Sequence, residues 1–421
     1  MTFDRAKLTP EALAAMAEGQ PGGKVWGKAF DKRKTTLCEE ALAELRNALA
    51  KDIMYGFYRE HRLPLDVKGG PELEKCAKIP GWTVGSACWI APSMAFLARD
   101  TRDTAEAAVA LRTARNAADT VISLSFPADW AYAFFPNMVR DADLGPLWKD
   151  YLTGEKTFDE WRNYMVSRQE GRYAPIWDNW VIDPGLMFLD MYDATKEQKY
   201  LDAAKRLAKT YSNTQLPSGT WPYFFNPRTG KAVADNEWPP VLTVLFLDRL
   251  AAQYGIRDYE QTADRAFQWV WEKEVVPFDL RAHYWDVPPK PRGSQGALAA
   301  SEIAMCLFNC AERNPEYLAK GEEILRWVEK TFVSWDQGGA VSEQTGFMAK
   351  VRFAGGGVAQ AYVKAFEVTG DPIYLAKGLT IFHTVLENKG KEPFDWYGCR
   401  AAINALDVYP FLKKHNLPGG E

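Results

Sequence analysis

Two kinds of apolar pattern alternate along the chain. In the first kind, apolar residues recur at i, i+3, i+4 and i+7 with charged residues between them, as in a helix that buries one face. Four such segments each carry a tyrosine near their start: Tyr200, Tyr259, Tyr317 and Tyr374. These tyrosines are 59, 58 and 57 residues apart. The chain therefore contains a repeat of nearly constant length.

The second kind of segment is apolar on almost every side. Four examples begin at Gly185, Val241, Ala297 and Gly357, between the amphipathic segments. A helix that is apolar all round is surrounded by other helices. The triplet Phe-Leu-Asp occurs in two of these segments at positions 58 residues apart, so they keep the same period. We therefore expect amphipathic outer helices to alternate with buried inner helices.

The same two patterns extend toward both ends of the chain. Further outer helices are expected at 36–55 and 105–122, and further inner helices at 84–98 and 396–413. Six hairpins of this kind close into a ring, whereas an open solenoid would need polar capping repeats. The sequence thus predicts an all-α protein, an (α/α)6 barrel forming one domain over 1–421. Residues 1–35 would be an N-terminal extension and residues 126–176 an irregular insertion.

The connections between helices differ in length according to their direction. The outer-to-inner connections are long and aromatic, and they cover 212–238, 273–295, 333–357 and 389–398. The inner-to-outer connections are short and polar. Long loops in a compact domain are uncommon without a function. Aromatic residues make up 13% of the chain, and flat rings with a polar edge suit the faces of sugars. We expect a carbohydrate-binding cleft at this rim.

Carboxylates at the starts of the inner helices are the main catalytic candidates. Asp178 stands between Trp177 and Trp180, and Asp183 precedes Pro184. Hydrolysis of a glycosidic bond commonly uses two carboxylates, and Glu237 of the next hairpin is the preferred partner of Asp178. Each of the two aspartates has a structural alternative. Asp183 would be the N-cap of a helix that begins at Pro184, and Asp178 would close an Asx turn.

Other polar and aromatic residues of the predicted rim complete the candidate site. Tyr173 and His283 are further catalytic candidates, and His283 is the one histidine of a rim loop. The candidates for substrate binding are Trp177, Trp180, Arg172, Trp221, Tyr223, Tyr284, Trp285, Arg352 and Trp396. Arginine binds carboxylates in a fork, so the basic residues among them favour a substrate that contains uronate.

Charge and motifs exclude several classes of function. A net charge of −4 disfavours a polyanion-binding surface, so no nucleic-acid partner is expected. No apolar run reaches the ~18 residues that span a bilayer, so no membrane partner is expected. Metal-ligand pairs and phosphate-binding loops are absent from the sequence, which predicts neither metal nor cofactor. No secretory segment is visible at the N-terminus, which fits a cytoplasmic protein, or a periplasmic or secreted one whose signal had been removed.

The alternating helices, the repeat period and the loop SGTWPYFFNPRTG (218–230) resemble the six-hairpin glycosidase-type superfamily. The resemblance covers residues 36–413 and implies the barrel fold. This group includes glycoside hydrolases, unsaturated-uronyl hydrolases, polysaccharide lyases and sugar 2-epimerases. The epimerases use histidines on the barrel axis, and this chain has few. The uronyl hydrolases use an aspartate, a role that Asp178 could match. The lyases use tyrosine with histidine or asparagine, as Tyr173, Tyr223, Tyr284 and His283 could supply.

Three functions follow from these residues. The first is hydrolysis of glycosidic bonds in an oligo- or polysaccharide by Asp178 and Glu237. The second is β-elimination on a uronate, in which Arg172 neutralises the carboxylate and Tyr173 or Tyr284 takes the proton. The third is a non-catalytic carbohydrate-binding barrel, for which the aromatic residues suffice.

Overall fold

The fold is described from a computed structural model. The described residues are 4–30, 84–123, 125–136, 160, 174–175, 184–222, 224–232, 237, 239–280, 295–342 and 354–387. The chain forms two compact units. Unit 1 comprises Met1–Gly56, Glu274–His283 and Pro291–Glu421, and unit 2 comprises Phe57–Lys273 and Tyr284–Lys290.

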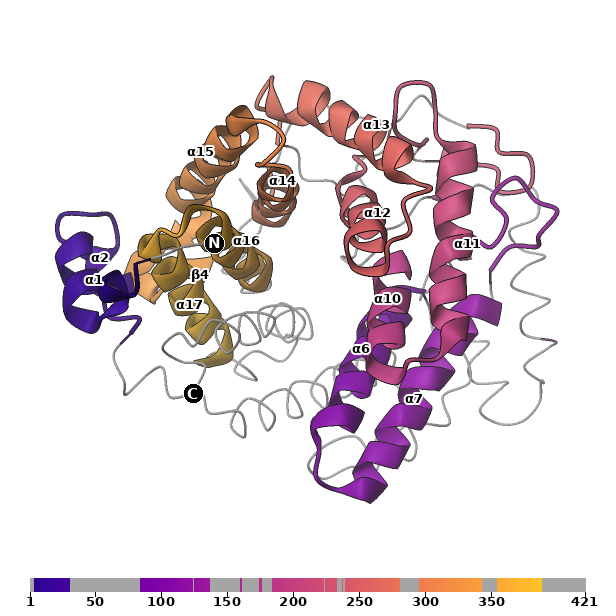
Figure 1. The fold of residues 1–421 in the computed structure, drawn as a ribbon, viewed down its shortest axis with the longest axis horizontal. Coiled ribbons are helices and arrows are strands. Elements are labelled where there is room, and N and C mark those ends of the chain that lie inside the picture. The colour runs from indigo at the N-terminus through magenta and orange to yellow at the C-terminus, as the bar shows by residue number, and fades with distance from the viewer. Residues whose placement is uncertain are drawn as a thin grey trace. The chain divides into compact units, whose positions relative to one another are not determined.

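The described residues of unit 2 form three helical hairpins, whose helices are labelled in Figure 1. They are α6 (Val84–Asp100) with α7 (Thr104–Ser123), α10 (Pro184–Thr195) with α11 (Gln198–Thr214), and α12 (Val241–Tyr254) with α13 (Glu260–Val270). A π-helical turn, Trp271–Val275, follows α13. Within each hairpin the two helices pack against each other, and α10 also packs against α6 and α12.

In unit 1 the described residues form two further hairpins and an N-terminal helical segment (Figure 1). The hairpins are α14 (Ala297–Asn309) with α15 (Pro315–Phe332), and α16 (Ala354–Thr369) with α17 (Pro372–Glu387). The N-terminal segment contains η1 (Arg5–Leu8), α1 (Pro10–Ala17) and α2 (Gly23–Trp26). Between α15 and α16 lie β3 (Val333–Ser334), the turn η3 (Trp335–Gln337) and β4 (Ala340–Val341), and β3 pairs antiparallel with β4.

The predicted alternation of inner and outer helices is confirmed for the five described hairpins. The inner helices contact one another, α6 with α10, α10 with α12, and α14 with α16. The outer helices are amphipathic: α11 buries Tyr200 and Leu207 but exposes Gln198 and Lys199. Short turns lead from inner to outer helices, and long connections lead back, as expected. The helices predicted at 36–55 and 396–413 lie outside the described residues.

Glycines allow the inner helices to approach closely. A Cβ atom on Gly185 of α10 would lie 2.5 Å from Cε2 of Phe246 on α12. A Cβ on Gly357 of α16 would lie 2.4 Å from Cδ1 of Leu298 on α14. Both distances are shorter than Cβ contacts in proteins, so a side chain at Gly185 would displace the Phe246 ring, and one at Gly357 would displace the end of the Leu298 side chain.

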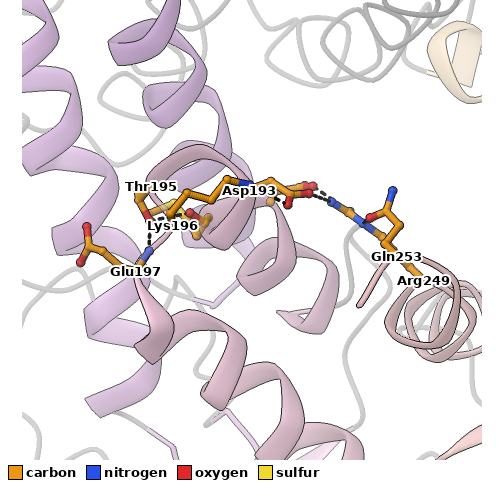
Figure 2. Close-up of polar contacts among 8 residues, drawn as sticks. Asp193, Thr195, Lys196, Glu197, Arg249 and Gln253 are labelled. Carbon is orange, nitrogen blue, oxygen red and sulfur yellow. Dashed lines mark hydrogen bonds and ion pairs between the residues drawn. The ribbon is translucent and has the colours of Figure 1, made fainter. Parts of the chain in front are cut away.

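An arginine joins two inner helices beside their inner-to-outer turns (Figure 2). Arg249 of α12 contacts Asp190 of α10 at 2.7 Å and Asp193 at 2.9 Å, and its Nε donates to Gln253 at 2.8 Å. Asp190 belongs to the first repeated Phe-Leu-Asp triplet. Burial raises the pKa of the Asp190 carboxyl, and the charge of Arg249 opposes that rise. The network therefore fixes α10 to α12 at this end of unit 2.

The adjoining turn between α10 and α11 is closed by a threonine. The hydroxyl of Thr195 donates to the carbonyl of Met191 at 2.7 Å and accepts from the backbone N–H of Glu197 at 3.2 Å. Glu197 then binds Arg115 of α7 at 2.6 Å. Glu197 thus ties this short turn to α7, and Asp193 ties the end of α10 to α12, as Figure 2 shows. In the described part of the chain, no helix is both long and apolar enough to cross a bilayer.

Candidate functional site

The described part of the predicted rim in unit 2 is organised by one short strand. This strand, β2 (Phe224–Phe225), pairs antiparallel with β1 (Ala174–Pro175). Phe225 also forms an isolated bridge with Ala232, and Pro222 forms one with Glu237. This part of the connection therefore has β1 as one partner, through Phe224 and Phe225, and the end of the same connection as the other, through Pro222 and Phe225. Two segments that are far apart in sequence meet at this strand.

A tight turn follows β2 within the same connection. The side chain of Asn226 accepts hydrogen bonds from the backbone N–H groups of Arg228 and Thr229 at 3.0 and 3.1 Å. Gly230 has a positive φ of 73° and donates its N–H to the carbonyl of Asn226 at 2.8 Å. The asparagine thus fixes the turn through its own side chain. This turn holds the returning residues beside the strand.

Part of the predicted insertion packs against that turn. The segment 125–136 is closed by a bridge between Ser125 and Pro136. The backbone N–H of Tyr132 donates to the carbonyl of Pro227 at 3.0 Å, and its ring stacks on Phe225 with 3.7 Å between centroids. Burial raises the pKa of the Tyr132 phenol above its ordinary value. Tyr132 is therefore a neutral packing residue rather than a base.

The prediction that Trp221 binds sugar is not supported by its position. Its side chain is 0% exposed, its indole N–H donates to the carbonyl of Tyr211 at 3.0 Å, and its ring lies 5.2 Å from that of Tyr211. A ring needs an open face to stack on a sugar. Trp221 is instead a core residue that anchors the connection to α11, and we remove it from the substrate-binding candidates.

Glu237 is exposed at the end of the connection. Its Oε2 accepts a hydrogen bond from the indole N–H of Trp269 on α13 at 3.0 Å. The N-cap residue of the next helix, α12, is Pro240. Glu237 is therefore not the cap, so its carboxylate is available for another role.

The other predicted site residues cannot be placed by the structure. Those outside the described residues are Asp178, Asp183, Tyr173, His283, Trp177, Trp180, Arg172, Tyr223, Tyr284, Trp285, Arg352 and Trp396. Two observations bear on them indirectly. Tyr173 and Asp178 flank the paired strand β1 in the sequence, and α10 begins at Pro184, as the pattern predicts.

The structure adds a residue, Trp269, that no sequence pattern indicated. Trp269 lies on the apolar side of an amphipathic helix and is 7% exposed, like an ordinary core residue. Its polar partner, Glu237, is 32 residues away along the chain, and no motif links the two. Among the residues that can be described, no group of three or more His, Cys, Asp or Glu side chains could hold a metal ion.

Comparison with known proteins finds similar solved structures but no similar sequences. No protein-family model matches the chain, and no curated protein matches it in sequence. A cellobiose 2-epimerase from Spirochaeta thermophila is similar over 87% of this chain and 96% of its own, with 11% identity and a TM-score of 0.54. A GH76 alpha-mannanase from Bacteroides thetaiotaomicron is similar over 87% and 97%, with 12% identity and a TM-score of 0.53.

A third similar structure is that of another hydrolase. The unsaturated glucuronyl hydrolase from Streptococcus agalactiae is similar over 88% of this chain and 92% of its own, with 10% identity and a TM-score of 0.52. Identities this low carry information about the fold rather than about the reaction. The chain has the (α/α)6-barrel fold.

Proposed function

We propose that the protein is a carbohydrate-active enzyme that hydrolyses a glycosidic bond, with Asp178 and Glu237 as its two carboxylates. The observation that carries the proposal is the pairing of β1 with β2. It connects the segment that bears Asp178 to the connection that bears Glu237. The shared fold with a mannanase and a glucuronyl hydrolase adds support at the level of the fold.

Chain geometry limits how far apart the two carboxylates can be. Asp178 follows Pro175 by three residues, and three residues span at most about 11 Å. Pro175 pairs with Phe224, and Glu237 bridges Pro222 on the same short segment. Neighbouring strands lie about 4.8 Å apart, so two partners of one strand are about 10 Å apart. Paired carboxylates in glycosidases are about 5–9.5 Å apart, which this arrangement can accommodate.

The two carboxylates would divide the chemistry of hydrolysis. Asp178, between two tryptophans, would give its proton to the leaving oxygen, because an apolar setting favours the protonated acid. Glu237 accepts one hydrogen bond through Oε2, and no described residue binds its Oε1. That oxygen would activate water or stabilise the developing positive charge on the sugar. Arg172, in the same unit, would bind the carboxylate of a uronate.

The oligosaccharide screen that tests this proposal has a distinct reading for each alternative. The purified protein is incubated with neutral and uronate-containing oligosaccharides in heavy-oxygen water, and the products are analysed by mass spectrometry. Hydrolysis is expected, with products that together gain one water and carry the heavy oxygen. Products without added water, one of them an unsaturated uronate, would instead identify a lyase. An unchanged panel with retained binding would overturn hydrolysis and leave the binding barrel, or an epimerase, whose product has the mass of its substrate.

The hydrogen bond from Trp269 to Glu237 gives a more local prediction. Trp269→Phe keeps an aromatic ring in the core but removes the N–H, so Glu237 loses its anchor. A hydrogen bond to a charged group contributes about 1.5–3 kcal/mol, so we expect kcat/KM to fall at least about tenfold.

The matched control for this variant is Trp327→Phe on α15, where the ring packs edge-on against Phe278 and Phe332. It makes the same truncation without touching Glu237, so kcat/KM should stay within a factor of two or so of the parent. Thermal unfolding of both variants separates lost stability from lost positioning. Equal kcat/KM in the two variants would remove Trp269 from the mechanism.

A further inference from the structure

The N-terminal segment 4–30 is packed onto unit 1 rather than trailing from it. Its apolar side chains form one cluster with residues of α16 and α17. The buried members are Leu8, Leu13, Ala17, Trp26, Ala29, Phe30, Val363, Phe366, Leu375, Ala376 and Leu379. The helices α1 and α2 both contact α17. The segment therefore covers an outer helix of the barrel.

Within this segment, Gly22 makes an unusually close approach to the connection between α15 and α16. Gly22 has a positive φ of 69°, and a Cβ atom on it would lie 2.2 Å from Cγ of Trp335. Trp335 is the first residue of η3, inside the predicted rim connection 333–357. The N-terminal segment thus touches the connection directly, at a point where no side chain would fit.

A buried ion pair links the same two parts a second time. Glu329 of α15 accepts a hydrogen bond from the indole N–H of Trp335 at 3.0 Å and binds Lys377 of α17 at 2.8 Å. The ammonium group of Lys377 lies 5.4 Å from the centre of the Trp26 ring. Trp26 in turn donates its indole N–H to the carbonyl of Pro21 at 2.8 Å, beside Gly22. These contacts therefore connect Trp335 back to the N-terminal segment through Glu329 and Lys377.

Trp335, a member of this set of contacts, lies at the start of the rim connection. Beyond Trp335 the chain turns at Gly338, whose carbonyl accepts from the hydroxyl of Thr384 on α17. It then returns as β4 to pair with β3. A Cβ on Gly339 would lie 3.1 Å from the Trp335 ring. The position of this tryptophan therefore affects the whole described part of the connection, 333–342.

We propose that residues 4–30 form an intramolecular brace that sets the conformation of the rim connection 333–342. Docking of the N-terminal segment fixes Trp335 from both sides, through Gly22 and through the Trp26–Lys377–Glu329 contacts. Undocking the segment would release Trp335 and loosen the connection. Docking of residues 4–30 is thereby coupled to the conformation of the rim connection 333–342. The coupling does not depend on the reaction proposed for Asp178 and Glu237.

Two glycines of the brace provide a matched pair of variants. Gly19 and Gly22 both have positive φ, 72° and 69°, so alanine strains the backbone equally at either position. A Cβ on Gly19 meets nothing within 4 Å, whereas one on Gly22 meets Trp335. The difference in behaviour between Gly19→Ala and Gly22→Ala therefore reports the contact with Trp335, separately from the strain of placing alanine at a positive φ.

The measurement is amide hydrogen exchange on the full chain, read by mass spectrometry of peptides. Gly22→Ala is expected to accelerate exchange in 333–342 about tenfold or more relative to Gly19→Ala. Exchange in α7, in unit 2, should be equal in both variants and serves as the internal reference. If 333–342 exchanges equally in the two variants, the brace does not act on the connection and the proposal is overturned.

A second variant approaches the coupling from the other side. Trp335→Phe keeps a ring against Gly22 but removes the N–H that Glu329 accepts. Because coupling is reciprocal, exchange should rise in 4–30 as well as in 333–342. A rise confined to 333–342 would contradict the proposal. This variant decides the question even if Gly22→Ala proves too unstable to purify.

Discussion

Asp178→Asn is expected to lower kcat on the cleaved oligosaccharide by about 10²–10⁴-fold, because a positioned general acid or base contributes a factor of that size. Asparagine has nearly the same shape as aspartate but cannot transfer the proton. Binding of the intact oligosaccharide, measured by titration calorimetry, should therefore remain within a few fold of the parent. A loss of turnover with retained binding is the result that identifies a catalytic carboxylate.

The control for Asp178→Asn makes the same chemical change on an outer helix. Asp202 of α11 accepts a hydrogen bond from Gln198 at 2.9 Å, and asparagine can still accept it. Asp202→Asn should leave turnover unchanged. Unaltered turnover in Asp178→Asn would exclude this residue and leave Asp183 and Glu237 as the carboxylates to test. Loss of binding together with turnover would indicate a substrate-binding role instead.

The second large effect is expected on stability. Lys377→Met should reduce the free energy of unfolding by about 3–5 kcal/mol, because it leaves the Glu329 carboxylate buried without its partner. The two side chains are only 11% and 14% exposed. Methionine keeps the length and most of the volume of the lysine stem, so the loss reports mainly on charge. Equilibrium unfolding in urea measures it.

Two further variants separate the buried charge from the packing. Combining Lys377→Met with Glu329→Gln removes both charges and keeps an acceptor for Trp335, so most of the lost stability should return. Lys320→Met breaks a comparable pair with Glu323, 2.8 Å long but 29% and 46% exposed, and should cost less than about 1 kcal/mol. Similar losses for Lys377→Met and Lys320→Met would mean that water reaches the Glu329 pair.

The repeating helices could be predicted because their signal is local and occurs many times. Each outer helix alternates buried and exposed residues at helical spacing, and each inner helix is apolar all round, so errors at one repeat are corrected by the others. Pro184 at the start of α10 follows from its fixed φ. The direction of the long connections then follows from the order of the helices. These features need no knowledge of distant contacts.

The roles of individual rim residues depended on contacts that the sequence does not record. Trp221 stands beside Pro222 and Gly219, in a setting typical of an exposed loop, yet it is buried against Tyr211. A tryptophan in a loop can cover a core or bind a sugar, and its neighbours in sequence are the same in both cases. The hydrogen bond between Trp269 and Glu237 joins residues that are 32 positions apart, and it could not be predicted from the sequence either.

The N-terminal segment was underestimated for a related reason. Its helices are short: α1 has eight residues and α2 has four. So few residues do not show a recognisable hydrophobic periodicity. Leu8, Leu13 and Trp26 are nevertheless buried against the α16–α17 hairpin. Their partners lie more than 300 residues later in the chain. A pattern search within one segment cannot find a surface contributed by another.

The network around Arg249 has a consequence for how this protein can change over evolution. It fixes α10 to α12 beside the short turns, while the long connections begin at the opposite ends of the same helices. Lengthening a flexible loop twofold costs only about 0.6 kcal/mol. Insertions in the long connections can therefore accumulate without disturbing the packing of these two helices.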